Sequence, residues 1–234
     1  MSLSSLSNLP VLSRPLEGVE LVLFDLDGTL IDSVPSLALA VDRMLQQLGR
    51  ETAGQEKVRQ WVGNGAAMLV NRALSASPEV DPELGEALKA QALELFMQAY
   101  AEADHQDTPL YPGVRSCLDQ LAERGIRLAL VTNKPERFLG SLLDELELAP
   151  YFERVLGGDS LAHKKPHPLP LLHCIEHLGS GAARTLMVGD SATDVQAARA
   201  AGVRVACVSY GYSYPQPVAA SEPDWLVDCL TELL

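Results

Sequence analysis

Short apolar runs that end in polar residues recur along the chain and limit the folds that it can adopt. They lie at residues 19–24, 127–133, 185–190 and 203–208, with a weaker run at 154–159. Helical patterns separate the later runs, at 114–125, 135–148, 169–178 and 192–201. Strands that alternate with helices predict an α/β fold with a Rossmann-like parallel sheet core covered on both faces. In such a sheet, ligands bind outside the carboxyl ends of the strands, so the polar residues that end these runs should converge there.

The stretch from residue 35 to residue 108 interrupts this alternation. Its apolar residues recur at helical spacing and it contains no β-branched apolar run, so we expect an inserted all-helical domain. Prolines stand at both junctions, as a hinged lid would need. The expected parts are a loose N-terminal tail (1–18), a catalytic core (19–34 and 109–234) and a helical cap domain (35–108).

The charge balance excludes several classes of partner. Eighteen Lys+Arg against 31 Asp+Glu give a formal charge of −13, which argues against nucleic acid and against an anionic membrane surface. No stretch is suited to span a membrane, and the N-terminal segment indicates a loose tail rather than a secretory signal or a transit peptide. The four cysteines are scattered without a C-x-x-C pair, so we expect a reducing, cytoplasmic location.

Two carboxylates, Asp25 and Asp27, follow the first apolar run at positions i and i+2. Because close carboxylates repel each other, a hard divalent cation with oxygen ligands is their natural partner. One carboxylate can then act as a nucleophile while the other transfers protons. If the chain bends after the strand, the backbone carbonyl of Asp27 faces the site instead of its carboxylate. The alternative is a solvated acidic turn.

Later strand ends supply further polar groups. Asp190 and Asp194 stand one helical turn apart, where the two carboxylates can cap a helix N-terminus and complement its dipole. Thr132 ends another strand just before a helix, where a hydroxyl and free N–H groups suit a phosphoryl oxygen. The alternative for Thr132 is an ordinary helix cap.

These residues stand in segments that resemble a known family. FDLDGTLIDS, residues 24–33, resembles the first signature of the haloacid-dehalogenase superfamily of phosphohydrolases. Thr132 in LVTNKP, Lys165 in HKKPHP, and Asp190 and Asp194 in VGDSATD match the later signatures in order. The resemblance runs from about residue 19 to the C-terminus, and the helical insertion resembles the family's small cap domain.

The resemblance implies a mechanism for this chain. Asp25 would attack phosphorus and become a transient aspartyl-phosphate, while Asp27 would serve as the acid and then the base. Mg²⁺ would bind the Asp25 carboxylate, the Asp27 backbone oxygen and Asp190, with Asp194 acting directly or through water. Lys165, rather than its neighbour Lys164, would offset the negative charge, because the family pattern sets the lysine directly before proline. The same motifs supply three expected substrate-binding residues, Gly28, Thr29 and Asn133.

Within the superfamily, several stretches resemble bacterial phosphoglycolate phosphatases, among them VGNGA, TPLYPGV and GDSATD. This resemblance implies a small phosphorylated metabolite as partner, 2-phosphoglycolate first, and a monomer or a small homo-oligomer. Asn64, between two glycines in the insertion, is expected to sense the non-phosphate end of the substrate. The alternatives are a phosphatase for another sugar or nucleotide phosphate, a phosphomutase, or a non-catalytic phosphate-binding regulatory protein.

Overall fold

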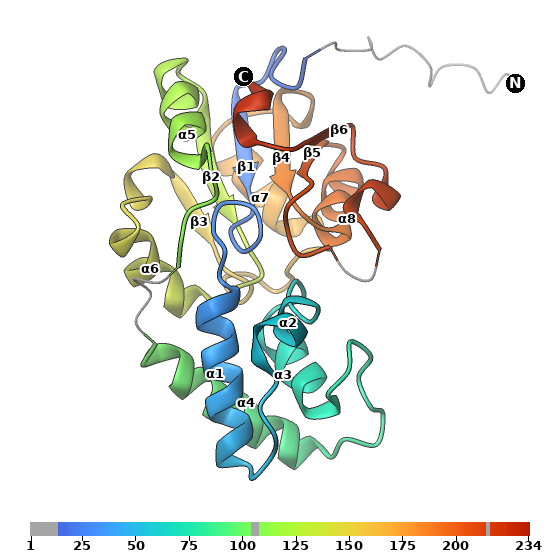
Figure 1. The fold of residues 1–234 in the computed structure, drawn as a ribbon. Helices are drawn as coiled ribbons and strands as arrows, with labels where there is room; N and C mark the ends of the chain where they lie inside the picture. The colour runs from blue at the N-terminus through green and yellow to red at the C-terminus, as the bar shows by residue number, and fades with distance from the viewer. Residues whose placement is uncertain (1–13, 104–107, 214–215) are drawn as a thin grey trace, which may run out of the picture.

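A six-stranded parallel sheet forms the centre of the protein, whose computed structural model describes residues 14–103, 108–213 and 216–234. The strands lie in the order β3-β2-β1-β4-β5-β6 (Figure 1). Their bounds are β1 Leu21–Phe24, β2 Arg127–Val131, β3 Arg154–Leu156, β4 Thr185–Gly189, β5 Arg204–Val208 and β6 Trp225–Val227. The Rossmann-like α/β core expected from the sequence is confirmed.

Strand β1 lies at the point where the strand order reverses. The chain runs from β1 outward through β2 and β3, then crosses to the other side of β1 and continues through β4, β5 and β6. Phe24, the last residue of β1, pairs in register with Leu130 and Val188 on its two neighbours. The carboxyl ends of the three strands are therefore level, and a crevice opens at this kind of reversal.

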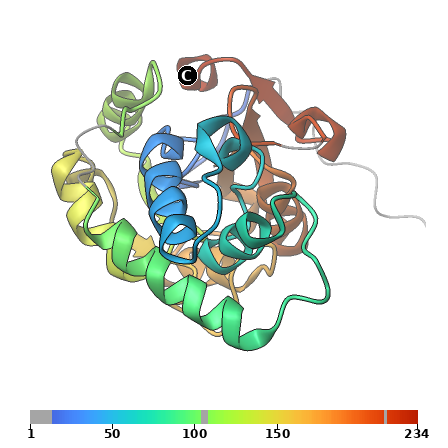
Figure 2. The same cartoon turned by 60° about the horizontal axis from the view of Figure 1, so that its bottom comes forward.

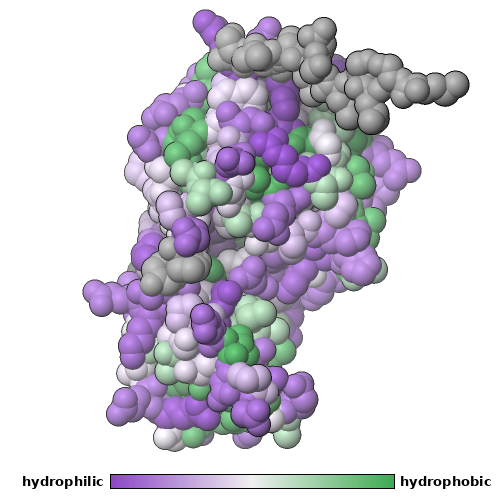
Figure 3. Space-filling model, turned by 90° about the vertical axis from the view of Figure 1, so that its right-hand side faces the viewer, coloured by the Kyte–Doolittle hydropathy of each residue, from purple (hydrophilic) through white to green (hydrophobic). Residues whose placement is uncertain are grey.

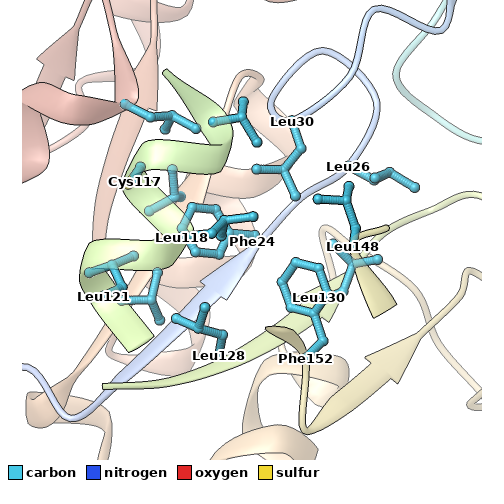
Figure 4. Close-up of a cluster of buried hydrophobic side chains, with 14 of the residues drawn as sticks. Phe24, Leu26, Leu30, Cys117, Leu118, Leu121, Leu128, Leu130, Leu148 and Phe152 are labelled. Carbon is cyan, nitrogen blue, oxygen red and sulfur yellow. The ribbon is translucent and has the colours of Figure 1, made fainter. Parts of the chain in front are cut away.

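Helices cover both faces of the sheet. α5 (Val114–Glu123) and α6 (Leu139–Glu145) pack on one face, while α7 (Leu169–His177) and α8 (Ala192–Ala201) pack on the other. Successive residues of β1 alternate between the two cores, because side chains of a strand point to opposite faces. Figure 4 shows Phe24 of β1 against Leu118 of α5, in the core on the first face.

The stretch between β1 and β2 forms four helices that lie beyond the ends of the strands (Figures 1 and 2). They are α1 (Val34–Gln47), α2 (Gly54–Arg59), α3 (Ala66–Ser75) and α4 (Glu86–Ala101). Their apolar faces form a separate hydrophobic cluster, which Phe138 joins from the β2–α6 connection. Trp61 and Leu69 are buried in this cluster, whereas Met68 is exposed.

The chain leaves the sheet and returns to it at adjacent points. Ile31, before α1, and Leu110, after the four helices, form an antiparallel bridge. Asp32 N–H donates to the Pro109 carbonyl at 2.9 Å, and Tyr111 N–H donates to the Leu30 carbonyl at 3.0 Å. Two backbone segments paired in this way connect the insertion to the core.

Some elements differ from the expectation. The helix expected at 135–148 is divided into a 3₁₀ turn and the shorter α6, and strand β6 was not expected. The expected N-terminal tail lies outside the described residues up to residue 13, and residues 14–18 form a bend and a turn. The 3₁₀ turns are Glu136–Phe138, Ala149–Tyr151, Ala182–Arg184, Val218–Ser221 and Leu230–Leu233.

The surface visible in Figure 3 is mostly hydrophilic, with hydrophobic side chains scattered over it. In the described part of the chain, no helix has both the length and the apolar character needed to cross a membrane.

Candidate active site

The turn after β1 carries the two carboxylates that the sequence places at its end. Asp25 continues the β1–β4 ladder, since its N–H donates to the Val188 carbonyl at 2.9 Å. Asp25 is buried, and the Asp27 side chain is 17% exposed. Burial raises the pKa of Asp25 to about 6, although the neighbouring Lys165 ammonium opposes this shift. Asp25 is therefore held in a low-dielectric position where it needs cationic partners.

Gly28 allows the turn to approach β4 closely. Its φ is +88°, a conformation that residues with a side chain rarely adopt. A Cβ at this position would also collide with the carboxylate of Asp190 and with the ring of Tyr212. The predicted substrate-binding role of Gly28 stays a prediction, and the structure gives the residue a steric reason to be glycine.

Lys165 joins the carboxylates from the opposite direction, on the connection between β3 and α7. Its Nζ lies 2.8 Å from Asp25 Oδ1 and 2.6 Å from Asp194 Oδ1, and its side chain is 2% exposed. Burial works against its charge, but the carboxylates of Asp194 and Asp25 reverse this and raise the pKa of Lys165 above its usual value. Lys164 lies outside this group, since it is exposed and its Nζ donates to the Asn64 carbonyl at 3.0 Å.

Asp190 and Asp194 follow β4 but have different surroundings. Asp190 accepts a hydrogen bond from the Tyr212 N–H at 2.6 Å, and burial together with the charge of Asp25 raises its pKa well above the usual value. Asp194 is the third residue of α8 and forms a capping box with Ser191. Its Oδ2 accepts from the Ser191 hydroxyl at 2.7 Å, while its Oδ1 is held by Lys165. Both oxygens of Asp194 therefore have partners, Oδ2 in the capping contact and Oδ1 in the ion pair with Lys165, and its role at a metal ion stays a prediction.

The end of β2 brings Thr132 and Asn133 to the same place. Thr132 is buried, and its hydroxyl accepts from the Lys134 N–H at 3.3 Å. Asn133 donates to the Lys165 carbonyl at 3.0 Å, which fixes the loop that carries the lysine. In the described part of the chain, Asn133 Oδ1 and the Thr29 hydroxyl are buried polar atoms without a hydrogen-bond partner.

Asn64 lies where the insertion meets the core. Its Oδ1 accepts from Arg72 at 2.9 Å, and its Nδ2 lies 3.3 Å from the Thr193 hydroxyl of α8. The cavity beside the site is lined by Gly63 and Gly65, the two neighbours of Asn64. The predicted sensing role of its side chain stays a prediction. Of the two contacts seen, the one with Thr193 joins the insertion to the core, whereas Arg72 belongs to the insertion itself.

Lys134 is a site residue that the sequence reasoning missed. Its Nζ lies 3.1 Å from Asp27 Oδ1 and 3.3 Å from Asp27 Oδ2, and its side chain is 3% exposed. It stands two residues after Thr132, at a strand end where the other functional candidates also stand. The signal available in the sequence was a charged residue directly after a predicted strand, where such residues converge on the site.

The cluster suits a divalent cation. Oxygens of three carboxylates, Asp25, Asp190 and Asp194, lie within 4.8 Å of one another. Together with Asp27, these carboxylates face the two ammonium groups of Lys134 and Lys165, which leaves an excess of two negative charges. Oxygen ligands with an excess of negative charge fit a hard cation such as Mg²⁺.

The sequence as a whole matches a known family. The model of the haloacid dehalogenase-like hydrolases matches residues 22–208. The chain belongs to this family.

Relatives of this hydrolase resemble it over most of its length. The chain is 52% identical over 214 residues to the phosphoglycolate phosphatase of Pseudomonas putida, covering 92% of this chain and 78% of that protein. It is 45% identical to the phosphoglycolate phosphatase of Vibrio parahaemolyticus, covering 93% and 96%. A crystal structure described as a predicted phosphoglycolate phosphatase from Haemophilus somnus superposes with a TM-score of 0.84, at 36% identity, covering 92% of this chain and 96% of that chain.

Proposed function

We propose that this hydrolase is a phosphatase that converts 2-phosphoglycolate into glycolate and phosphate through an aspartyl-phosphate on Asp25. The observation that carries the proposal is the pair of carboxylates at the end of β1, one beside Lys165 and the other beside Lys134. A nucleophile and a proton-transfer group two residues apart are what a two-step displacement at phosphorus requires.

In the first step, an oxygen of Asp25 attacks phosphorus and the bond between phosphorus and the ester oxygen breaks. Asp27 donates its proton to the departing alkoxide, which leaves as the hydroxyl of glycolate. Lys165 holds Asp25 in place at 2.8 Å and offsets the charge of carboxylate and phosphate together. Thr132 and the N–H groups that follow it bind a phosphoryl oxygen.

In the second step, Asp27 takes a proton from water, and the water oxygen attacks phosphorus. The bond between phosphorus and Asp25 breaks, so the carboxylate is restored and inorganic phosphate is released. Asp27 then holds the proton that the next cycle requires. Splitting one difficult displacement into two gives each step a positioned proton-transfer group.

We assign a Mg²⁺ site to the carboxylates of Asp25 and Asp190 and the backbone oxygen of Asp27. Bound there, the ion would neutralise charge on the phosphoryl oxygens. Asp194 supports the site through its ion pair with Lys165 and its place at the start of α8, and acts on the ion directly or through water. Gly28, Thr29 and Asn133 complete the surroundings of the phosphate.

Residues 35–108 are proposed to act as a cap over this site. The cavity beside Asp27 is lined from both sides, by Thr132 and Lys134 of the core and by residues of α1, α3 and α4. Closure of such a cap excludes water while the nucleophile attacks, and opening releases the product. The paired junctions at Ile31 and Leu110 supply the hinge.

The substrate assignment is supported by the relatives named phosphoglycolate phosphatase at 45–52% identity. The unpaired state of all four cysteines supports the cytoplasm as the place of action. We retain the expectation of a monomer or a small homo-oligomer.

Phosphate release from a panel of small esters, with and without Mg²⁺, tests this function. The wild type should turn over 2-phosphoglycolate fastest, depend on Mg²⁺, and lose turnover in Asp25→Asn. Preference for another ester would keep the mechanism and overturn the substrate. Absence of turnover on every ester would favour the non-catalytic, regulatory alternative.

A further inference from the structure

A mostly apolar cavity lies between the cap helices and the core, with Asp27 at its border. Leu37, Leu69 and Phe96 contribute its apolar wall from three cap helices. Among the described residues that line the cavity, Lys134 carries the only positive charge. A cation in such a lining is costly to desolvate, so its position calls for an anionic partner.

The structure holds Lys134 firmly in this position. Its backbone N–H donates to the Thr132 hydroxyl at 3.3 Å, and its carbonyl accepts from the Gly158 N–H at 2.8 Å. Its Nζ lies 4.7 Å from the centre of the Tyr100 ring, which comes from cap helix α4. The ammonium is thus fixed by the core and covered by the cap.

The position of Lys134 relative to Asp27 matches the shape of the proposed substrate. Asp27 faces the oxygen that leaves with glycolate, and Lys134 Nζ lies 3.1 and 3.3 Å from the two oxygens of Asp27. In 2-phosphoglycolate the carboxylate is attached to the carbon that bears this leaving oxygen. An ammonium has three donors, and two of the contacts of Lys134 go to the same carboxylate, so one of them can pass to a substrate carboxylate while the other still holds Asp27.

The surroundings offer no comparable place for that second negative charge. The rest of the cavity lining has apolar or uncharged side chains, apart from Asp27 itself, which would repel it. The formal charge of −13 also repels a substrate with two anionic groups, so a local cation must capture it.

We propose that Lys134 determines specificity by binding the carboxylate of the substrate, so that the enzyme prefers phosphate esters with an anionic group on the carbon next to the ester oxygen. The proposal rests on the proposed function, because it places the leaving oxygen at Asp27. It adds a binding site for the part of the substrate that does not react.

The test compares Lys134→Met with the wild type on two esters with the same two-carbon skeleton, 2-phosphoglycolate and 2-hydroxyethyl phosphate. Loss of one charge-assisted hydrogen bond should lower kcat/KM for 2-phosphoglycolate about tenfold to a hundredfold more than for 2-hydroxyethyl phosphate. Lys134→Arg should restore part of the preference. Lys57→Met, an equal charge change on the exposed side of α2, should leave the ratio unchanged.

Equal losses on both esters would show that Lys134 only positions Asp27, and no loss on either would show that it has no role. Both results overturn the proposal. Calorimetry adds a measurement that does not need the variant to fold. Wild-type protein with Mg²⁺ should bind 3-phosphonopropionate, in which a methylene replaces the ester oxygen, at least tenfold more tightly than propylphosphonate, and equal affinities would overturn the proposal.

These experiments separate the two proposals. If the wild type prefers a different carboxylated ester, the assignment of 2-phosphoglycolate fails while the role of Lys134 stands. If no ester is turned over, the proposed function fails, and the phosphonate affinities of the wild type and of Lys134→Met still decide whether Lys134 recognises the carboxylate.

Discussion

Replacing Asp194 with asparagine should destabilise the protein strongly, whether or not a metal ion is bound. Asp194 Oδ1 holds Lys165 at 2.6 Å, and Oδ2 accepts from the N–H and the hydroxyl of Ser191. An asparagine has only one oxygen, so its amide group would face a donor whichever way it is turned. The substitution therefore breaks a buried ion pair and one end of a capping box together.

The magnitude follows from burial. The side chains of Lys165 and Asp194 are 2% and 1% exposed, and removing one partner of a buried pair costs about 3–5 kcal/mol. For a chain of this size, each kcal/mol lowers Tm by roughly 2–4 °C, so Tm should fall by roughly 6–20 °C. The exposed pair Arg184–Glu20, at 2.6 Å, is the matched control; Glu20→Gln should cost at most about 1 kcal/mol.

Thermal and urea unfolding of both variants, each with EDTA and with Mg²⁺, measure the effect. Asp194→Asn should be much less stable than Glu20→Gln already in EDTA. If the two variants unfold alike in EDTA, the lysine-anchoring reasoning is refuted. A loss that appears only with Mg²⁺ would make Asp194 a metal ligand instead.

Three further results are expected. Gly28→Ala should weaken Mg²⁺ binding and turnover at least tenfold, measured by calorimetry and phosphate release, because the new methyl group collides with Asp190; unchanged binding would contradict this reading of the turn. Mg²⁺ should raise Tm more at pH 7.5 than at pH 5, since the raised pKa of Asp25, about 6, means that protons compete with the ion below that value; a larger gain at pH 5 would refute it. Thiol titration of the native protein should find one rapidly reacting cysteine, Cys229, whereas all four cysteines should react after denaturation. The other three thiols, Cys117, Cys174 and Cys207, should react slowly in the native protein because burial raises their pKa.

The sheet could be predicted from the sequence because its strands are buried on both faces. β1 reads as an uninterrupted apolar run, and all four of its residues are buried. β6 has only three residues and one of them, Leu226, is exposed, so its pattern was too weak to detect. Within the insertion, the short helix α2 buries only Val58, so it shows no apolar periodicity of its own.

The site residues at strand ends could be predicted because parallel strands bring their carboxyl ends to one edge. The contacts among them could not. The pairing of Lys134 with Asp27 depends on how the β2–α6 connection turns, and that of Lys165 with Asp194 on how the β3–α7 connection folds back. Such pairings join residues far apart in sequence, and no local pattern encodes them.

The pairing of Ile31 with Leu110 has a consequence for how such an enzyme can change. Since the chain departs and returns through neighbouring backbone segments, the ends of the insertion are already close enough for a short turn to connect them. Insertions of other lengths or shapes can therefore be exchanged at this point without altering the strand order.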